Sequence, residues 1–288
     1  MQARQGSVSA GQVESRISCG EFCFPAVPGR HERMGIVKLL GFDLVDVGLF
    51  LSDGASLVAD PESVIAALRT SLREYELGCD DLFFTVGSTV EEIAPNQRDS
   101  GRRLESRREF AAAALVAAEL GIRGITVLPG VSWAESPETA WAVCVEELGW
   151  RLDQALRLGL QLRCEPHVGS IAPVPELVTR LCREVPGLGL TLDVSHFDAQ
   201  AVTLDRTLAL VPLARHVHVR ASMPGAVQVR WRDNETDFAA ITAALDQAGY
   251  DGVFCIEYVP MAKWRCDEMD VVSESLAARA ALHELGLR

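Results

Sequence analysis

Eight short apolar runs, separated by amphipathic helical stretches, constrain the fold of this chain more than any other feature of its sequence. The runs lie at residues 17–24, 44–50, 82–86, 124–128, 160–165, 188–193, 215–219 and 252–258. Strands that alternate with helices in this way are typical of βα units with parallel strands. A chain of 288 residues has the usual length of one barrel built from such units. The pattern therefore predicts a single (β/α)8 TIM barrel.

Residues that start and stop helices support this prediction. Asp60 and Pro61 are typical of a helix start, and we expect the helix that they open to end at Gly78. Pro175 opens a later helix, which Pro186 ends. The segments between the apolar runs therefore have the boundaries that crossover helices need.

A doubly wound open sheet is the competing architecture. It would place a glycine-rich phosphate-binding turn after the first strand, with an acidic residue about twenty residues further on. The first unit reads ISCGEFCFPAVPGRHERMG, which contains no such turn. Because neither an internal repeat nor a linker divides the sequence, we expect a flexible tail over residues 1–16 and one barrel domain over residues 17–288.

The composition narrows the classes of partner and location. A formal net charge of −13 repels phosphate backbones, so we do not expect nucleic acid as a partner. No apolar run reaches the length of a membrane span, and the N-terminal residues lack the apolar stretch of a signal peptide. The eight cysteines are scattered without the spacing of a disulfide framework. These features predict a reduced, cytoplasmic protein that binds no membrane.

Charged or polar residues interrupt four of the apolar runs at the point where each strand should end. Glu165, Asp193, His218 and Glu257 belong to the fifth, sixth, seventh and eighth runs. In a TIM barrel, the carboxyl ends of the strands converge on one rim, where catalytic groups collect. We therefore expect these four side chains to face a common centre.

This set of side chains predicts one divalent metal ion. Three carboxylates at one point would repel one another, and each would be driven to protonate. A dication removes that penalty. Three oxygen ligands and one imidazole suit Mn²⁺ or Mg²⁺, with Co²⁺ or Zn²⁺ as alternatives, and Mn²⁺ is our first expectation. Any one of these residues alone would more often be a capping or core residue, so the prediction rests on the four together.

The same motifs resemble those of a known superfamily, the xylose isomerase-like barrels of sugar isomerases and epimerases. The resemblance covers the chain from about residue 17 to the end, and EPHVGS, LDVSH, HVHVR and DFAAITAALDQAGYDGVFCIEY carry it. In the ketose epimerase branch, it implies that the four residues above bind the metal. It also implies that Glu165 and Glu257 form the acid/base pair and that His196 contacts substrate hydroxyls.

The chain departs from the family pattern near the implied ligands. The epimerases tend to carry a further Glu six residues beyond the first ligand, where this chain has Ile171. The family often has an Asp shortly after the second His of its His-x-His motif, whereas this chain continues with Arg220. In exchange, His167 lies two residues after Glu165 and so on the same side of the strand. We expect His167 and Arg220 to bind substrate together with His196.

Arginines gather in two segments. Arg220, Arg230 and Arg232 follow the seventh run, where barrel enzymes often bind phosphate. They could grip a phosphate or carboxylate of the substrate, and a solvated charged loop is the equal alternative. Five arginines lie between residues 98 and 108, where we expect a solvated helix face or a subunit contact rather than a lid. We expect His216 to lie deeper in the seventh strand as a structural residue.

These observations predict a divalent-metal-dependent isomerase or epimerase that acts on a small sugar, a sugar phosphate or a related polyol. The metal would stabilise an enediolate as a Lewis acid. One glutamate would remove the proton next to the carbonyl, and the other would deliver one. The expected partners are a small carbohydrate-like substrate and further copies of the chain in a homo-oligomer.

Three other functions compete with this one. A dehydratase of the inosose or dehydroshikimate type would use the same metal and expel a hydroxyl with help from His167 or His196. An abasic-site nuclease would need several more histidines, and the ends of the third and fourth runs, FFTVGST and ITVLPG, contain none. A non-catalytic binding protein is the last alternative, and the complete four-residue set argues against it.

Overall fold

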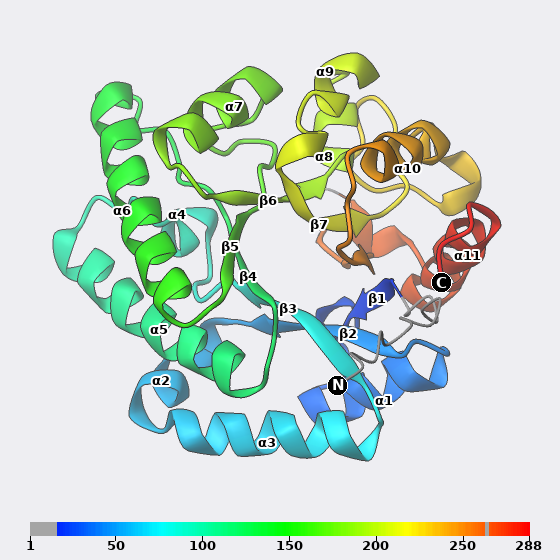
Figure 1. Cartoon of the computed structure of the whole chain (residues 1–288), viewed down its shortest axis with the longest axis horizontal. Coiled ribbons are helices and arrows are strands. Elements are labelled where there is room, and N and C mark those ends of the chain that lie inside the picture. The colour runs from blue at the N-terminus through cyan, green and yellow to red at the C-terminus, as the bar shows by residue number, and fades with distance from the viewer. Residues whose placement is uncertain (1–15, 263–264) are drawn as a thin grey trace, which may run out of the picture.

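Eight parallel strands close into a barrel in the computed structural model (Figure 1), which describes residues 16–262 and 265–288. Each strand pairs with the next, and β8 pairs with β1. The strands are β1 (Ile17–Gly20), β2 (Leu44–Leu49), β3 (Gly78–Phe84), β4 (Gly124–Val127), β5 (Gln161–Cys164), β6 (Gly189–Asp193), β7 (Ala214–Val219) and β8 (Phe254–Ile256). The predicted TIM barrel is therefore confirmed.

Helices surround the barrel and connect its strands (Figure 1). In chain order they are α1 (Arg30–Leu39), α2 (Leu51–Ala59), α3 (Pro61–Glu74), α4 (Val90–Ile93), α5 (Ser100–Glu119), α6 (Pro137–Arg157), α7 (Pro175–Glu184), α8 (Ser195–Asp198), α9 (Leu204–Leu208), α10 (Phe238–Gln247) and α11 (Val271–Glu284). Short 3-10 turns include η1 (Glu21–Cys23), η2 (Val211–Leu213), η3 (Trp231–Asp233) and η5 (Cys266–Glu268). None of the helices in the described ranges is both long and apolar enough to cross a membrane.

The end of α3 differs from the expected position. The helix stops at Glu74, and Gly78 instead begins β3. Glu76 adopts a left-handed backbone conformation with φ of 51°, and the amide of Leu77 then donates to the carbonyl of Leu72. This is the hydrogen bond of a Schellman motif, which usually relies on glycine. The sequence prediction was wrong because a glutamate occupies the left-handed position here.

Strand β3 also begins earlier than the apolar run that predicted it. Its first half contains Asp80 and Asp81, which are buried inside the barrel. Arg163 Nη1 lies 2.9 Å from Asp80 Oδ2 and 3.0 Å from Asp81 Oδ1, and His216 Nε2 lies 2.6 Å from Asp46 Oδ2. We call these five residues the floor cluster. Their ion pairs allow charged side chains in strands that should be apolar.

The first described residue of the chain is attached to the segment that leads into β8. Arg16 donates from its side chain to the carbonyls of Tyr250 and Gly252 at 2.9 and 3.1 Å, and its guanidinium stacks on Tyr250 and Phe254. Arg16 was expected to belong to the tail, but these contacts attach it to the barrel. The rest of the expected tail, residues 1–15, lies outside the described residues.

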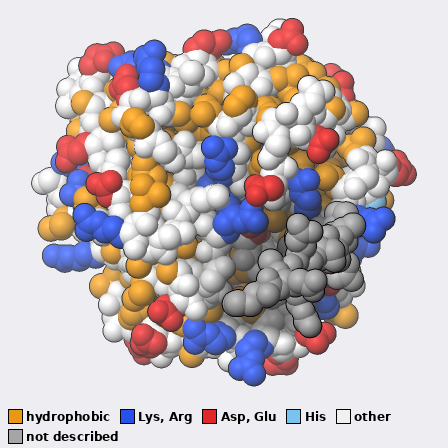
Figure 2. Space-filling view, in the orientation of Figure 1, with side chains coloured by type: hydrophobic (Ala, Val, Ile, Leu, Met, Phe, Trp, Pro, Cys, Tyr) orange, Lys and Arg blue, Asp and Glu red, His pale blue; other side chains and the backbone are white. Residues whose placement is uncertain are grey.

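The arginine-rich segment before and within α5 forms ion pairs inside the chain. Arg107 lies 3.0 Å from Glu147 on the neighbouring helix α6, and Arg98 pairs with Glu135. These residues are not part of the lining described for the cavity above the barrel, so a helix face is the better interpretation and a lid is not supported. On the face shown in Figure 2, acidic and basic side chains are interspersed over the surface.

Candidate metal and substrate site

The four residues predicted as metal ligands lie together at the carboxyl end of the barrel. Glu165 directly follows β5, Asp193 ends β6, His218 lies near the end of β7, and Glu257 directly follows β8. Each offers a ligand atom, these atoms all lie within 4.8 Å of one another, and all four side chains are buried. We call these residues the rim cluster.

Two cationic side chains lie among the three carboxylates of the rim cluster. His218 Nδ1 lies 2.7 Å from Glu165 Oε1 and 3.2 Å from Glu257 Oε2. Arg220, just after β7, contacts Asp193, and its Nη2 lies 3.3 Å from Glu257 Oε2. Although it is buried, Glu257 Oε2 accepts no hydrogen bond from the described residues. The carboxylates therefore outnumber the cations around them.

The pKa values reflect this imbalance. Burial, followed by the negative charge of Glu257, raises the pKa of Glu165 to about 7. Burial also opposes ionisation of Asp193, but Arg220 outweighs it and lowers the pKa of Asp193 to about 2. Burial would lower the pKa of His218, yet Glu257 and Glu165 raise it well above its ordinary value. Negative charge is thus only partly neutralised at this point of the barrel.

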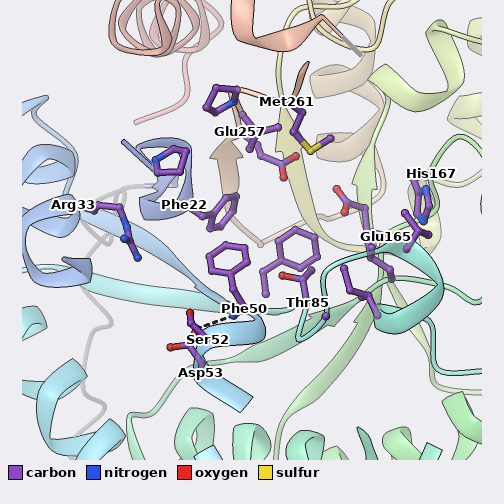
Figure 3. Close-up of a pocket in the computed structure, with 18 of the residues that line it drawn as sticks. Phe22, Arg33, Phe50, Ser52, Asp53, Thr85, Glu165, His167, Glu257 and Met261 are labelled. Atoms are coloured by element: carbon purple, nitrogen blue, oxygen red, sulfur yellow. Dashed lines mark hydrogen bonds between the residues drawn. The ribbon is translucent and has the colours of Figure 1, made fainter. Parts of the chain in front are cut away.

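A cavity of about 650 Å³ opens above the rim cluster (Figure 3). Glu165 and Glu257 project into it from two sides, and Phe83, Leu128 and Met261 contribute apolar walls. Clefts that bury small-molecule ligands usually measure about 300–1,000 Å³ and combine apolar walls with a few polar groups. The cavity therefore has the size and lining of a substrate site.

A divalent cation fits the donor set at the base of this cavity. Three carboxylates and one imidazole nitrogen meet at one point, and the carboxylates outnumber the two cationic side chains that pair with them. An excess of buried negative charge is costly in a protein interior unless a further cation binds there. The hard oxygen donors with one imidazole suit Mn²⁺ or Mg²⁺.

A second group of ligand-type residues, Asp46, His216, His218 and Cys255, also lies within 4.8 Å. Asp46 is already satisfied, because it accepts a hydrogen bond from Ser18 at 2.9 Å and lies 2.6 Å from His216 Nε2. Burial would lower the pKa of His216, but Asp46 raises it overall, so the two form an ion pair. His216 therefore has the structural position deep in β7 that the sequence suggested.

The two histidines predicted to bind substrate line the cavity beside Glu165. Their rings are 5.9 Å apart, and His167 Nδ1 lies 2.9 Å from the carbonyl of Val168. Arg220 donates to Nε2 of His196 at 3.0 Å. Burial lowers the pKa of His196 to about 3, despite the attraction of Asp193. His196 is therefore a neutral imidazole at neutral pH.

The arginines after β7 have different positions. Arg220 is buried at the edge of the cavity, and besides its carboxylate partners it donates from Nε to Ser195 at 3.0 Å. Arg230 and Arg232 are exposed and do not belong to the described lining of the cavity. The expected binding of a phosphate or carboxylate of the substrate by these two residues is therefore not supported. A solvated loop is the interpretation that the structure favours.

The end of the cavity that lies away from the rim cluster was not predicted from the sequence. Phe22 in η1 and Phe50 after β2 line it, followed by Asp53 of α2 and by Arg30 and Arg33 of α1 (Figure 3). An aromatic residue after a buried strand looks like a core residue in a sequence. The glycines that precede these rings by two positions are the signal that could have drawn attention to them.

A protein-family comparison supports this architecture. Residues 35–280 match the model of the family described as Xylose isomerase-like TIM barrel. No curated protein matches the sequence.

Several solved structures have the same fold. A D-psicose 3-epimerase studied in the presence of D-fructose is 16% identical with a TM-score of 0.73, covering 94% of this chain and 99% of its own. The 3-keto-D-glucoside 4-epimerase of E. coli is 19% identical with a TM-score of 0.69, covering 94% and 100%. A D-psicose 3-epimerase of Clostridium cellulolyticum H10, solved with D-tagatose, is 13% identical with a TM-score of 0.73, covering 95% and 100%. At these identities, the similarity establishes the fold.

Proposed function

This chain belongs to the xylose isomerase-like TIM barrel family, and we propose that it is a divalent-metal-dependent epimerase or isomerase of a small carbohydrate with a carbonyl group. The observation that carries the proposal is the rim cluster, in which three buried carboxylates and a histidine meet at the base of an open cavity. The similar folds of several sugar epimerases agree with this choice. We further propose a cytoplasmic location and a homo-oligomeric state.

The rim cluster would hold the metal through Glu165, Asp193, His218 and Glu257, with Mn²⁺ as the first choice. When bound, the metal supplies a Lewis acid that stabilises negative charge on neighbouring oxygens of the substrate. Asp193 and His218 hold their positions from β6 and β7, and Arg220 fixes the carboxylate of Asp193. Asp193 and His218 would bind the metal and Arg220 would orient Asp193, whereas the two glutamates would also face the substrate.

Glu165 and Glu257 form the acid/base pair in this proposal. They enter the cavity from β5 and β8, so that a substrate between them would meet one carboxylate on each side (Figure 3). One glutamate accepts the proton of the carbon next to the carbonyl, and the other returns a proton. A carboxyl group whose pKa lies near neutrality is suited to both directions of transfer, and the pKa of Glu165 is raised to about 7.

The histidines and Arg220 would orient the substrate. His196 is neutral and His167 lies beside it, so the two can exchange hydrogen bonds with sugar hydroxyls at the edge of the rim cluster. The dehydratase alternative needs a histidine acid at this place. Because Arg220 donates to Nε2 of His196, a histidine acid at this place would act through Nδ1 of His196 or through His167.

The charges in the cavity favour a substrate without a phosphate group. Arg220 pairs with Asp193, Arg30 pairs with Glu21 and Asp53, and Arg33 pairs with Glu21. Among the described residues, each arginine that lines the cavity therefore has a carboxylate partner. Because these carboxylates already balance the positive charge of the arginines, the cavity attracts a phosphate less than unpaired arginines would, whereas neutral hydroxyls need no excess positive charge.

The test begins with metal analysis of the purified protein. Ketoses, ketose phosphates and cyclic ketones are then incubated with the Mn²⁺-loaded protein in D₂O. We expect deuterium to enter next to the carbonyl of an unphosphorylated ketose and a new stereoisomer or isomer to form. Loss of water in place of isomer formation would favour the dehydratase, and metal-loaded protein that exchanges no C–H proton in any member of the panel would contradict the proposal.

A further inference from the structure

The cavity continues well beyond the rim cluster along a wall of aromatic rings. The ring of Phe83 lies 5.6 Å from that of His218, the ring of Phe22 lies 5.7 Å from Phe83, and the ring of Phe50 lies 6.3 Å from Phe22. Each distance joins ring centroids. The wall therefore leads, in three ring-to-ring steps, from a metal ligand to the loop after β2 (Figure 3).

Two glycines fix the outer rings of this wall in place. A Cβ atom on Gly20 would lie 2.5 Å from Cζ of Phe22, and one on Gly48 would lie 2.5 Å from Cζ of Phe50. No side chain fits at these distances, so both rings lie flat against the ends of β1 and β2. Phe22 is buried, whereas Phe50 is half-buried and lines the cavity.

A group of charged residues lies at the outer end of the aromatic wall. Arg30 donates from Nη2 to Asp53 Oδ2 at 2.9 Å and to the carbonyl of Gly48 at 2.8 Å, and Asp53 Oδ2 also accepts from the amide of Phe50 at 2.7 Å. Arg33 and Arg30 both pair with the buried carboxylate of Glu21. Two arginines and two carboxylates therefore balance in charge at this end.

Some atoms of these charged residues can still form hydrogen bonds with a ligand. Within the described ranges, no hydrogen bond reaches Nη1 of Arg30, Nη2 of Arg33 or Oδ1 of Asp53. Ser52 lines the cavity beside Asp53 (Figure 3). The place offers both donors and acceptors without a net charge, which suits hydroxyl groups better than an anion.

We propose that this outer part of the cavity is a second sugar subsite, and that the substrate is a ketose that carries a further sugar ring. This inference rests on the proposed function, because it assumes that the ketose binds at the rim cluster. A sugar ring has an apolar C–H face, which packs on aromatic rings, and a periphery of hydroxyls, which would reach Asp53, Arg33 and Ser52. A free monosaccharide at the rim cluster would leave the outer wall and its polar end without a ligand.

An alkyl or aryl group would fit the aromatic wall but not its end. It would remove water from Asp53 and the two arginines without replacing the lost hydrogen bonds, which is unfavourable. A second sugar ring satisfies both parts of the subsite. The chemical class that we assign is therefore a disaccharide or glycoside with an enolisable ketose at one end.

The experiment compares fructose with maltulose, isomaltulose and lactulose, which are fructose with a second sugar ring attached. Binding to the Mn²⁺-loaded protein is measured by calorimetry, and turnover by deuterium exchange. We expect at least one disaccharide to bind about tenfold more tightly than fructose, the size of one good aromatic contact. Equal affinities, weaker binding of all three disaccharides, or no binding of any sugar would overturn the second subsite. Tighter binding of a 6-O-alkyl fructose than of the disaccharides would overturn the assignment to a sugar.

Variants test whether the tighter binding of a disaccharide depends on Phe50. They also distinguish the second subsite from the proposed function. Phe50→Leu keeps an apolar side chain but removes the flat ring, and it should reduce the ratio of disaccharide to fructose affinity to near one. Phe50→Tyr should keep that ratio. Tyr75→Ala, a half-buried aromatic outside the cavity lining, serves as the control and should also keep it. An unchanged ratio in Phe50→Leu contradicts the second subsite. A disaccharide that binds tightly without any C–H exchange supports the subsite and contradicts the epimerase.

Discussion

Two groups of buried carboxylates lie inside this barrel, the floor cluster and the rim cluster, and their charges are neutralised in different ways. In the floor cluster, burial opposes the charge of Asp80, but His216 and Arg163 outweigh it and lower the pKa of Asp80. In the rim cluster, burial and the neighbouring Glu257 prevail and raise the pKa of Glu165 to about 7. Together with Arg123, which lies 3.3 Å from Asp80, the floor has three cations for its three carboxylates, although burial still raises the pKa of Asp81. The rim cluster has only His218 and Arg220 for three carboxylates.

The position of each cluster explains the difference. The floor cluster is buried and takes its counter-charges from within the chain. The rim cluster lines a cavity from which a cation and a substrate can enter. Buried charge that its own surroundings do not neutralise is a feature of functional sites, because the stability that it costs is recovered only when the ligand binds.

The largest effect that we predict is on metal binding at the rim. The double variant Asp193→Ala/His218→Ala should lose stoichiometric metal and reduce turnover on the order of 10⁴-fold or more, since ligand and geometry are lost together. Circular dichroism should show an intact barrel. Arg230→Ala, which changes an exposed arginine outside the cavity lining, is the control. Metal retained at one ion per chain in the double variant would contradict the assignment of the ligands.

The rim cluster was predictable from the sequence, and the floor cluster was not. Each rim residue stands out because it ends an apolar run, and the parallel barrel brings all such ends to one place. Asp80 and Asp81 instead made the start of β3 look like a loop. Their partner Arg163 lies more than eighty residues away, and no local pattern connects them.

The outer end of the cavity was missed for a related reason. Phe22 and Phe50 have the residue type of a core, and the ion pairs of Arg30 with Glu21 and Asp53 join three separate elements. Arg220 was predicted to bind substrate, and its ion pair with Asp193 was not foreseen because Asp193 comes from the neighbouring strand. Local patterns show which residues end a strand, but not which charges meet after the barrel closes.

The second prediction concerns the free energy of unfolding of a variant in which the floor cluster lacks the guanidinium of Arg163. Arg163→Met should destabilise the metal-free protein by about 3–5 kcal/mol, because Asp80 and Asp81 would stay buried without their partner. Glu165→Gln should change the stability of the same metal-free protein far less, since it removes one of several carboxylates that repel one another. Urea unfolding measures both. If Glu165→Gln were as destabilising as Arg163→Met, the contrast between the two clusters would be wrong.

The third prediction concerns removal of the metal. EDTA should abolish turnover and leave the barrel folded, because the floor cluster needs no ion. Mn²⁺ or Co²⁺ should restore turnover. At a free metal concentration of about 100 times Kd, binding stabilises the folded chain by about 2.7 kcal/mol, so thermal unfolding should shift upward on reloading. Full activity in protein shown to be free of metal would rule out a metal-dependent reaction.

The smallest effect that we predict is the pH dependence of one floor carboxylate. The pKa of Asp80 is lower in the folded chain than in the unfolded chain, because His216, Arg163 and Arg123 outweigh burial. A group of this kind stabilises the fold fully above its unfolded pKa of about 4, and the stabilisation is lost as the pH falls below that value. Wild type should therefore lose stability between about pH 4 and pH 2 through this residue.

Asp80→Asn isolates this contribution, since the amide keeps the size of the side chain but does not titrate. At pH 7, the variant should be less stable than wild type by about 1.5–3 kcal/mol, the usual value of a hydrogen bond to a charged group. As the pH falls from about 4 to 2, the two unfolding curves should converge, because protonation removes the same charge from wild type. Asp233→Asn, which alters an exposed carboxylate, should follow wild type at every pH. A difference between Asp80→Asn and wild type that stays constant down to pH 2 would show that Asp80 stabilises the floor through packing and not through its charge.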